Sequence, residues 1–401
     1  MKQKTIYNKI NPFIYGTAKI ASKAFCFYKL KLKVLKNELK KDKKAKIILC
    51  NHESIYDFMP IFSVVPTKAH MVMSSSILRS LPIYGLAVKC GVIGKNQFST
   101  LPTDLKKMKA VLDDNKTLCL FPSGLMPEGG VPTPTPKATA KAIKWFGVDV
   151  YVAKLRGAYL TKPKWSSVSR KGKSSIEIYK IISASDLSNF TLEQTQNLIE
   201  SHLDFDAYRN NDIDKIPFKN GDNIVGLENV LYVCPHCKKE FTVKPQNENV
   251  LTCAECGYSV KSDEFGILHQ NGSLPLIYKY VSDWFRFVEQ EEQTKVLNDE
   301  NFSMQTFAEI HKINDKKHKF EKVGYAKVEL SGNDFTLDGV LYDKKFTKKI
   351  FAGNFPTLPC VPGKRFEIQD GADIYRVYPE QPETVMKWLN SVKAIYKRNN
   401  K

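Results

Sequence analysis

The sequence has no stretch of the ~18–20 consecutive apolar residues that a helix needs to span a lipid bilayer. Its N-terminus lacks the clean apolar segment and small-residue cleavage site of a secretory signal peptide, so we expect neither a transmembrane span nor a signal peptide. Nine cysteines without a secretion signal indicate a reducing compartment, the cytoplasm. Arginine is scarce, at 8 of 61 basic residues. Because arginine is the better ligand for base edges and phosphates, this scarcity favours diffuse attraction to a lipid headgroup layer.

Positive charge is concentrated at the start of the chain. The formal net charge is +19, and residues 1–46 hold fourteen lysines against Glu38 and Asp42. A basic block this dense favours an anionic surface, either phospholipid or nucleic acid. Apolar side chains recur in it at helical intervals: Ile14, Ala18, Ala21, Phe25, Tyr28 and Leu32. Such a helix can lie in a membrane interface or pack on the protein's own core. We expect peripheral binding to anionic phospholipid at the cytoplasmic face of the cell membrane.

Strand and helix signals alternate through the first half of the chain. Short apolar runs and helical periodicities follow one another at 45–50, 55–64, 69–73, 76–88, 91–94, 102–114 and 117–121. Alternation at this spacing predicts βαβ units, and hence an α/β fold with a mainly parallel sheet flanked by helices.

A histidine and an aspartate stand at the end of the first buried strand. The apolar run 45–50 is followed by Asn51, His52 and, in the first turn of the next helix, Asp57. A carboxylate on one imidazole nitrogen fixes the tautomer and raises the basicity of the other nitrogen, which suits a general base for an alcohol. The alternative is a surface histidine beside a helix-starting aspartate.

Four motifs in order resemble those of the glycerolipid acyltransferases, the lysophosphatidic acid acyltransferase family. The Asn51–Asp57 segment resembles the first motif, and Cys90–Asn96 the second. The segment Leu118–Gly124 is similar to the third, and Val150–Gly157 to the late strand that closes the site. The extension 157–165 is similar to a bacterial branch with a cysteine-rich tail. The resemblance covers roughly residues 1–190 for the core and extends weakly to about residue 300.

This resemblance implies transfer of a fatty acyl chain from an acyl carrier protein or coenzyme A thioester to a lysophospholipid, foremost 1-acyl-glycerol-3-phosphate. It assigns His52 as the general base and Asp57 as its orienting partner. The residues expected to contact substrate are Lys95, Ser123, Gly124, Lys154 and Arg156.

The third motif departs from the family at two positions. Ser123 and Met126 stand where the family has Glu and Arg. The loss of this charged pair puts in doubt how the acceptor phosphate is held. Glu128 can supply a carboxylate from the loop, or it can be a solvated residue of a turn.

Four cysteines form a metal-ligand pattern. Cys234 and Cys237 make one C-x-x-C pair, and Cys253 and Cys256 make a second pair fifteen residues further on. Two such pairs match a closed tetrahedral Cys₄ zinc site, and four protein ligands leave no position for a water, so the expected zinc is structural. The alternative is a pair of redox dithiols.

The expected division of the chain follows from these signals. It comprises a basic amphipathic N-terminal helix with the first strand (1–35), an acyltransferase domain with its linker (36–228), a zinc ribbon (229–262), a helical connector (263–320) and a β-rich domain with a C-terminal helix (321–401). The last resembles a small pleckstrin-homology-like barrel.

Two other functions remain open from the sequence. A zinc ribbon on a basic chain also describes a nucleic-acid-binding protein, which would not need His52 and Asp57; under the acyltransferase interpretation no nucleic acid is expected. Loss of the Glu/Arg pair is also compatible with a lipid-binding relative that has weak catalysis.

Overall fold

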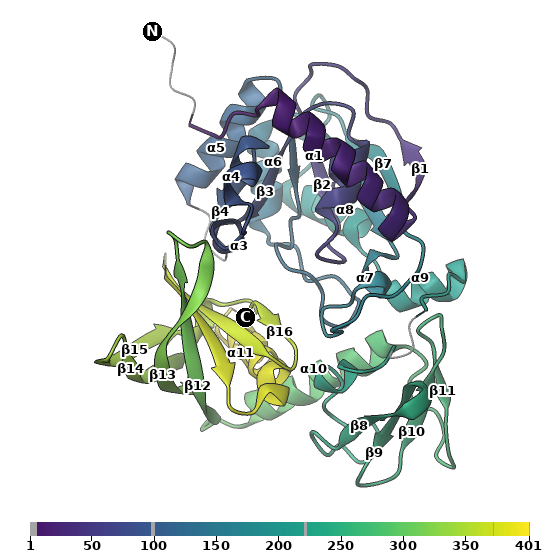
Figure 1. Cartoon of the computed structure of the whole chain (residues 1–401), viewed down its shortest axis with the longest axis vertical. Coiled ribbons are helices and arrows are strands. Elements are labelled where there is room, and N and C mark those ends of the chain that lie inside the picture. The colour runs from purple at the N-terminus through teal and green to yellow at the C-terminus, as the bar shows by residue number, and fades with distance from the viewer. Residues whose placement is uncertain (1–5, 98–100, 220–222, 372, 401) are drawn as a thin grey trace. The chain divides into compact units, whose positions relative to one another are not determined.

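A computed structural model describes residues 6–97, 101–219, 223–371 and 373–400. The chain divides into two compact units (Figure 1). The first comprises Met1–Pro163 and Ser169–Lys219, and the second comprises Lys164–Val168 and Asn220–Lys401.

The first unit is built on a seven-stranded sheet of order β1-β7-β6-β2-β5-β3-β4. All neighbouring strands are parallel except β6 and β7, so the predicted mainly parallel sheet is confirmed. The strands are β1 (Lys33–Asn37), β2 (Lys46–Cys50), β3 (Ala69–Ser74), β4 (Ile93–Lys95), β5 (Thr117–Leu120), β6 (Asp149–Arg156) and β7 (Ser175–Ile182).

Helices cover both faces of this sheet, and β2 is buried along its whole length. Ile47 and Leu49 of β2 contribute to one core cluster, and Ile48 and Cys50 contribute to the cluster on the opposite face. The helices are α1 (Pro12–Phe25), α2 (Phe58–Val64), α3 (Ser75–Arg79), α4 (Tyr84–Lys89), α5 (Pro102–Asp113), α6 (Ala138–Phe146), α7 (Ala158–Thr161), α8 (Leu192–Leu203) and α9 (Ala207–Asp214).

The single helix predicted over 76–88 is two short helices, α3 and α4. Pro82 lies between them, and a proline has no backbone N–H to continue the helical hydrogen bonds. The helix expected from residue 55 begins only at Phe58, because residues 51–57 form a loop that carries the histidine motif.

Helix α1 has apolar side chains on both its inward and its outward face. Tyr15 is buried on the inward face, and the Phe25 ring lies 5.2 Å from the Tyr56 ring. The predicted stripe is therefore divided: Ile14, Ala18 and Phe25 are half-buried, whereas Ala21 and Tyr28 are exposed. Periodicity could not separate the two faces because both are apolar.

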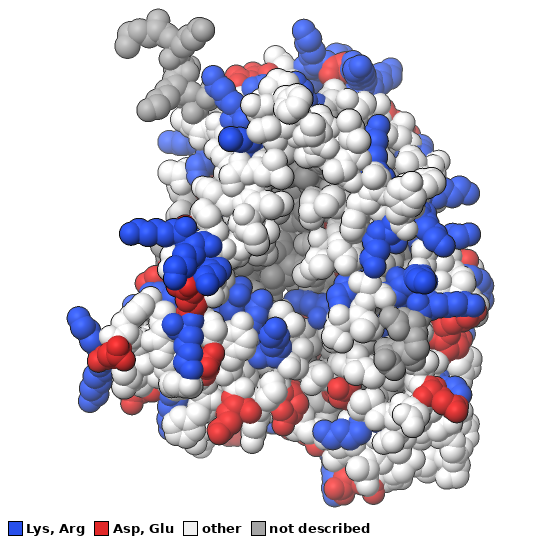
Figure 2. All heavy atoms as spheres, viewed as in Figure 1, with Lys and Arg blue, Asp and Glu red and all other residues white. Residues whose placement is uncertain are grey.

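The outward face carries three large apolar residues at seven-residue spacing, Phe13, Ile20 and Phe27, which are 79%, 70% and 70% exposed. Phe27 belongs to the π-helical turn Cys26–Leu30 that continues α1. Figure 2 shows a largely uncharged surface over α1 with lysines and arginines at its borders. Within the described part of the chain, no helix is long and apolar enough to cross a membrane.

The second unit begins with a four-stranded antiparallel sheet of order β11-β10-β9-β8, followed by helix α10 (Val281–Asn298). These strands are β8 (Val243–Gln246), β9 (Val250–Cys253), β10 (Ser259–Ser262) and β11 (Leu268–Gln270). Helix α10 packs against the C-terminal helix α11 (Val385–Asn399).

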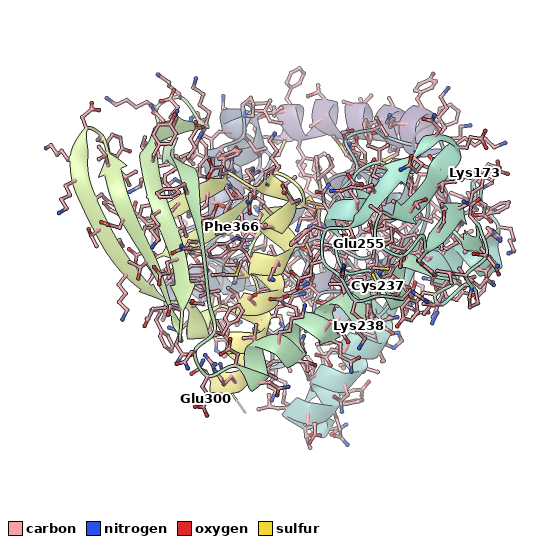
Figure 3. All side chains as sticks on the ribbon, turned by 90° about the horizontal axis from the view of Figure 1, so that it is seen from below. Lys173, Cys237, Lys238, Glu255, Glu300 and Phe366 are labelled. Atoms are coloured by element: carbon pink, nitrogen blue, oxygen red, sulfur yellow. The ribbon has the colours of Figure 1, made fainter. Side chains whose placement is uncertain are left out.

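A seven-stranded antiparallel sheet of order β15-β14-β13-β12-β18-β17-β16 completes the unit. The ring of Trp388 in α11 stacks on the ring of Phe366, which Figure 3 labels, at a centroid distance of 5.2 Å, and on the ring of Phe335 at 6.2 Å. These contacts seat the helix on the sheet. Residues 303–314, expected in the helical connector, form a strand. The strands are β12 (Ser303–Asn314), β13 (Lys319–Ser331), β14 (Asp334–Leu341), β15 (Lys344–Phe351), β16 (Cys360–Val361), β17 (Arg365–Asp370) and β18 (Asp373–Pro379).

Candidate functional site

The carboxyl ends of the parallel strands bring the sequence motifs to one edge of the first sheet. Strand β2 leads into His52, and the adjacent strand β5 leads into Ser123. Both residues line a pocket with a volume of about 420 Å³. Open α/β sheets characteristically bind ligands at this edge. The lining residues are Cys50, Asn51, His52, Pro122, Ser123, Pro132, Thr133, Pro134, Thr135, Glu200, Ser201, Leu203, Asp204 and Phe205.

His52, in the pocket wall, forms a hydrogen-bonded pair with the buried Asp57. His52 Nδ1 lies 2.7 Å from Asp57 Oδ2; the His52 side chain is 21% exposed and that of Asp57 is 1% exposed. A carboxylate only accepts, so this contact places the imidazole proton on Nδ1 and leaves Nε2 with a free lone pair. The ring of Phe121 lies 4.6 Å from the His52 ring.

Asp57 is fixed by the main chain of the loop that it closes. Its Oδ2 accepts hydrogen bonds from the backbone N–H groups of Glu53 at 2.5 Å and Ser54 at 2.8 Å. The Ser54 hydroxyl donates to Oδ1 at 3.3 Å. The carboxylate therefore has one fixed orientation toward His52.

The predicted substrate contacts divide into those at the pocket and those beside it. Ser123 lines the pocket, and Gly124 follows it with a φ of +67°, a conformation that glycine adopts without strain. The Gly124 N–H is already engaged by the Phe121 carbonyl at 3.0 Å. Lys95, Lys154 and Arg156 are not among the lining residues.

The three basic candidates differ in their distance from His52. Lys154 and Arg156 end β6, the direct neighbour of β2, whereas Lys95 ends β4, three strands from β2. At about 4.8 Å between neighbouring strands, three strands correspond to about 14 Å. Arg156 Nη1 lies 3.7 Å from Asp214 Oδ2. Burial lowers the pKa of Lys95 and of Lys154, and the nearby Arg156 lowers that of Lys154 further.

Glu128 is not the solvated turn residue that the sequence allowed, because it is only 4% exposed. It is also not among the residues lining the pocket. Its main-chain carbonyl accepts a hydrogen bond from the Tyr159 hydroxyl at 2.8 Å, which anchors the loop in the interior.

Two residues to which the sequence analysis gave no role flank His52. Asn51 and Glu53 are 3% and 2% exposed. Burial and then the neighbouring Asp57 raise the pKa of Glu53 to about 8. The sequence did carry a signal for them, because two further polar residues, Asn51 and Glu53, follow the apolar run Ile47–Cys50.

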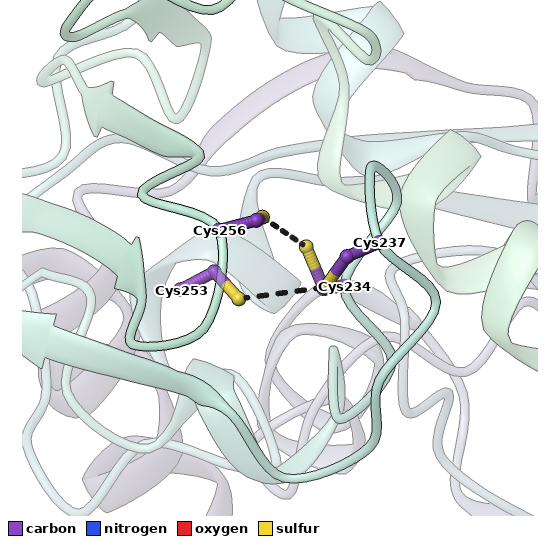
Figure 4. Close-up of side chains that lie close together, drawn as sticks. All are labelled: Cys234, Cys237, Cys253 and Cys256. Carbon is purple, nitrogen blue, oxygen red and sulfur yellow. Dashed lines mark hydrogen bonds between the residues drawn. The ribbon is translucent and has the colours of Figure 1, made fainter.

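The four cysteines of the second unit converge on one point (Figure 4). Their sulfur atoms all lie within 4.8 Å of one another, with Cys234–Cys256 at 3.7 Å and Cys237–Cys253 at 3.8 Å. Zn–S bonds of about 2.3 Å in a tetrahedron place sulfur atoms about 3.8 Å apart. This cluster can therefore hold a metal ion.

Comparison with protein families matches residues 31–166 to the acyltransferase family. These residues form an acyltransferase domain, and the predicted enzyme class, acyltransferase, is confirmed. Among solved structures, the chain is similar to the crystal structure of the 1-acyl-sn-glycerophosphate (LPA) acyltransferase PlsC from Thermotoga maritima, with 19% identity and a TM-score of 0.41. That match covers 47% of this chain and 76% of the other. No curated protein matches the sequence.

Proposed function

We propose that the protein transfers a fatty acyl chain from an acyl carrier protein or coenzyme A thioester to the free hydroxyl of a lysophospholipid, foremost 1-acyl-glycerol-3-phosphate, in phospholipid biosynthesis. The observation that carries this proposal is the His52–Asp57 pair in the wall of a pocket within an acyltransferase domain.

In this mechanism His52 Nε2 takes the proton of the acceptor hydroxyl as the oxygen attacks the thioester carbonyl. The tetrahedral intermediate then expels the thiolate, which recovers the proton from His52. Asp57 holds the tautomer and stabilises the imidazolium between the two steps. General-base assistance of this kind is worth roughly 10²–10⁴ in rate, and positioning and oxyanion stabilisation supply the rest.

Ser123, Gly124, Lys154 and Arg156 are the proposed substrate contacts nearest to His52, with Lys95 further along the edge. The amides of Glu53, Ser54 and Gly124 already have acceptors, so they are poor candidates for an oxyanion hole.

We further propose that the first unit binds the cytoplasmic face of an anionic membrane peripherally through α1. Support comes from the exposed residues Phe13, Ile20 and Phe27 on one face and from the lysines around them. An apolar face inserts into the headgroup boundary, and basic residues add electrostatic attraction.

The metal of the cysteine cluster is proposed to be structural zinc. The near-tetrahedral sulfur spacing and the all-thiolate ligand set favour zinc, and a closed site of this kind contributes folding free energy. The cluster would hold the two loops of the ribbon together and take no part in acyl transfer.

The test is acyl transfer by the purified full chain, followed by mass spectrometry of the product with lysophosphatidic acid and each acyl thioester. His52→Ala should abolish turnover. His269→Ala is a matched control, since His269 also contacts an aspartate, Asp263, at 2.8 Å, but is 57% exposed in the second unit. Wild-type turnover in His52→Ala would overturn the mechanism, and absence of product from the wild type with every donor would overturn the activity.

A further inference from the structure

The side chains of Asn51 and Glu53 attach the His52 loop to β6 and to α7, the helix that follows it. The β2–β6 ladder ends at the pair Cys50–Ala153. Beyond it, the Asn51 side chain continues the pairing: its Oδ1 accepts from Leu155 N at 2.7 Å, and its Nδ2 donates to Leu155 O at 2.9 Å. The position of residue 51 relative to β6 is thereby fixed by two hydrogen bonds.

Glu53 makes a second attachment on the other side of His52. Its Oε2 accepts from the backbone N–H of Tyr159, in α7, at 3.1 Å. Its own backbone N–H donates to Asp57 Oδ2 at 2.5 Å. Glu53 therefore contacts Asp57 through its main chain and α7 through its side chain, and so connects the two.

Burial, and after it the neighbouring Asp57, favour the neutral form of the Glu53 carboxyl over the ionised form. Asp57 faces it from the start of α2 and opposes its ionisation, whereas the positive charges of Arg156 and Lys154 on β6 act in the opposite direction and only partly offset this. Within the described residues, no lysine, arginine or histidine nitrogen lies within 4.0 Å of the carboxyl. Ionisation would place a second negative charge beside Asp57 in a site that excludes water, and this is unfavourable.

We propose that Glu53 is a positioning residue for the acyl-transfer reaction, and that its side chain keeps the His52–Asp57 loop in register with α7. When the carboxyl ionises at alkaline pH, repulsion between Glu53 and Asp57 displaces the loop and lowers activity, although Glu53 touches neither substrate nor the reacting atoms. The inference rests on the proposed function, because its readout is the activity assigned to His52.

The test compares pH profiles of kcat for the wild type, Glu53→Gln and Glu53→Ala. Glutamine keeps an acceptor for Tyr159 N and cannot ionise, so Glu53→Gln should retain kcat near pH 7 and lose the alkaline decline that the wild type shows near pH 8. Glu53→Ala should lower kcat by about 10- to 100-fold with little change in KM, since small misplacements of catalytic groups cost up to about two orders of magnitude.

Glu292→Gln is a matched control, because Glu292 is also fully buried but lies in the second unit. It should leave both kcat and the alkaline limb unchanged. If Glu53→Gln keeps the wild-type alkaline limb, or if folded Glu53→Ala keeps the wild-type kcat, the inference is wrong while the proposed function stands. A wild type without acyl transfer would instead refute the proposed function.

Discussion

The stability of the first unit should depend on pH through Glu53, independently of any catalytic role. The pKa of its buried carboxyl is about 8, against an ordinary value of 4.5. Between these values the folded state binds a proton that the unfolded state has released, so unfolding becomes easier as pH rises. The stabilisation is complete below about pH 4.5 and is lost progressively up to about pH 8.

The size of the effect follows from the same two values. A difference of about 3.5 in pKa, at about 1.4 kcal/mol for each unit, gives an upper value near 5 kcal/mol. Between pH 5 and pH 8 the loss is therefore about 4 kcal/mol. Glu53→Gln removes this dependence, because the amide does not titrate in this range while it keeps the side-chain shape.

Hydrogen exchange measured by mass spectrometry can detect this difference in the full chain. Peptides containing β2 should lose protection relative to Glu53→Gln by about tenfold for each pH unit between 5 and 8. Comparing the two proteins at the same pH cancels the intrinsic pH dependence of exchange. Peptides of β13 and β14, in the second unit, should show no difference. A wild-type-to-variant ratio that stays constant across this range would show that Glu53 is ionised throughout it, which would refute the reasoning.

Three further predictions concern the proposed site, membrane contact and metal. Asp57→Asn should reduce kcat less than His52→Ala, because the base remains but in a poorer orientation; equal losses in steady-state assays would contradict this. The double variant Phe27→Ser/Tyr28→Ser should weaken binding to anionic vesicles more than Phe25→Ser does, since Phe25 packs on the protein. High salt should weaken the binding of the wild type only partly. Sedimentation with vesicles measures both effects. Elemental analysis should find one zinc per chain, and absence of zinc would exclude the structural role. Chelation of the metal should increase hydrogen exchange in β8–β11 but not in β2.

The sequence predicted the parallel sheet and the position of the histidine loop because these depend on local pattern. The apolar run ending at Cys50 can be satisfied only as a buried strand, and the polar residues after it must lie at the strand end. The five-residue spacing from His52 to Asp57 then allows the carboxylate to return to the imidazole within one turn of chain. No distant residue is needed to specify this contact.

The remainder of the site depends on contacts between distant parts of the chain. Glu53 meets Tyr159 across 106 residues, and Asn51 meets Leu155 across 104. The pocket wall from Glu200 to Phe205 follows from the packing of α8 on the sheet. Hydrophobic periodicity predicts that α8 has an apolar face, but it does not predict which residues after β2 that helix will approach.

The order of the strands also distinguishes the basic candidates for holding a phosphate. Lys154 lies two residues after the buried Val152 in β6 and therefore projects to the same face, on which α6 and α8 pack. Asp204 at the pocket acts on its charge. In 1-acyl-glycerol-3-phosphate the phosphate and the free hydroxyl lie on neighbouring carbons, so the cation that holds the phosphate must lie close to His52. This condition favours Lys154 and Arg156, one strand from β2, over Lys95, which lies about 14 Å away by strand spacing. Under the proposed function, we therefore expect β6 to supply the cation in place of the arginine missing from the third motif, on the opposite side of His52 from that motif.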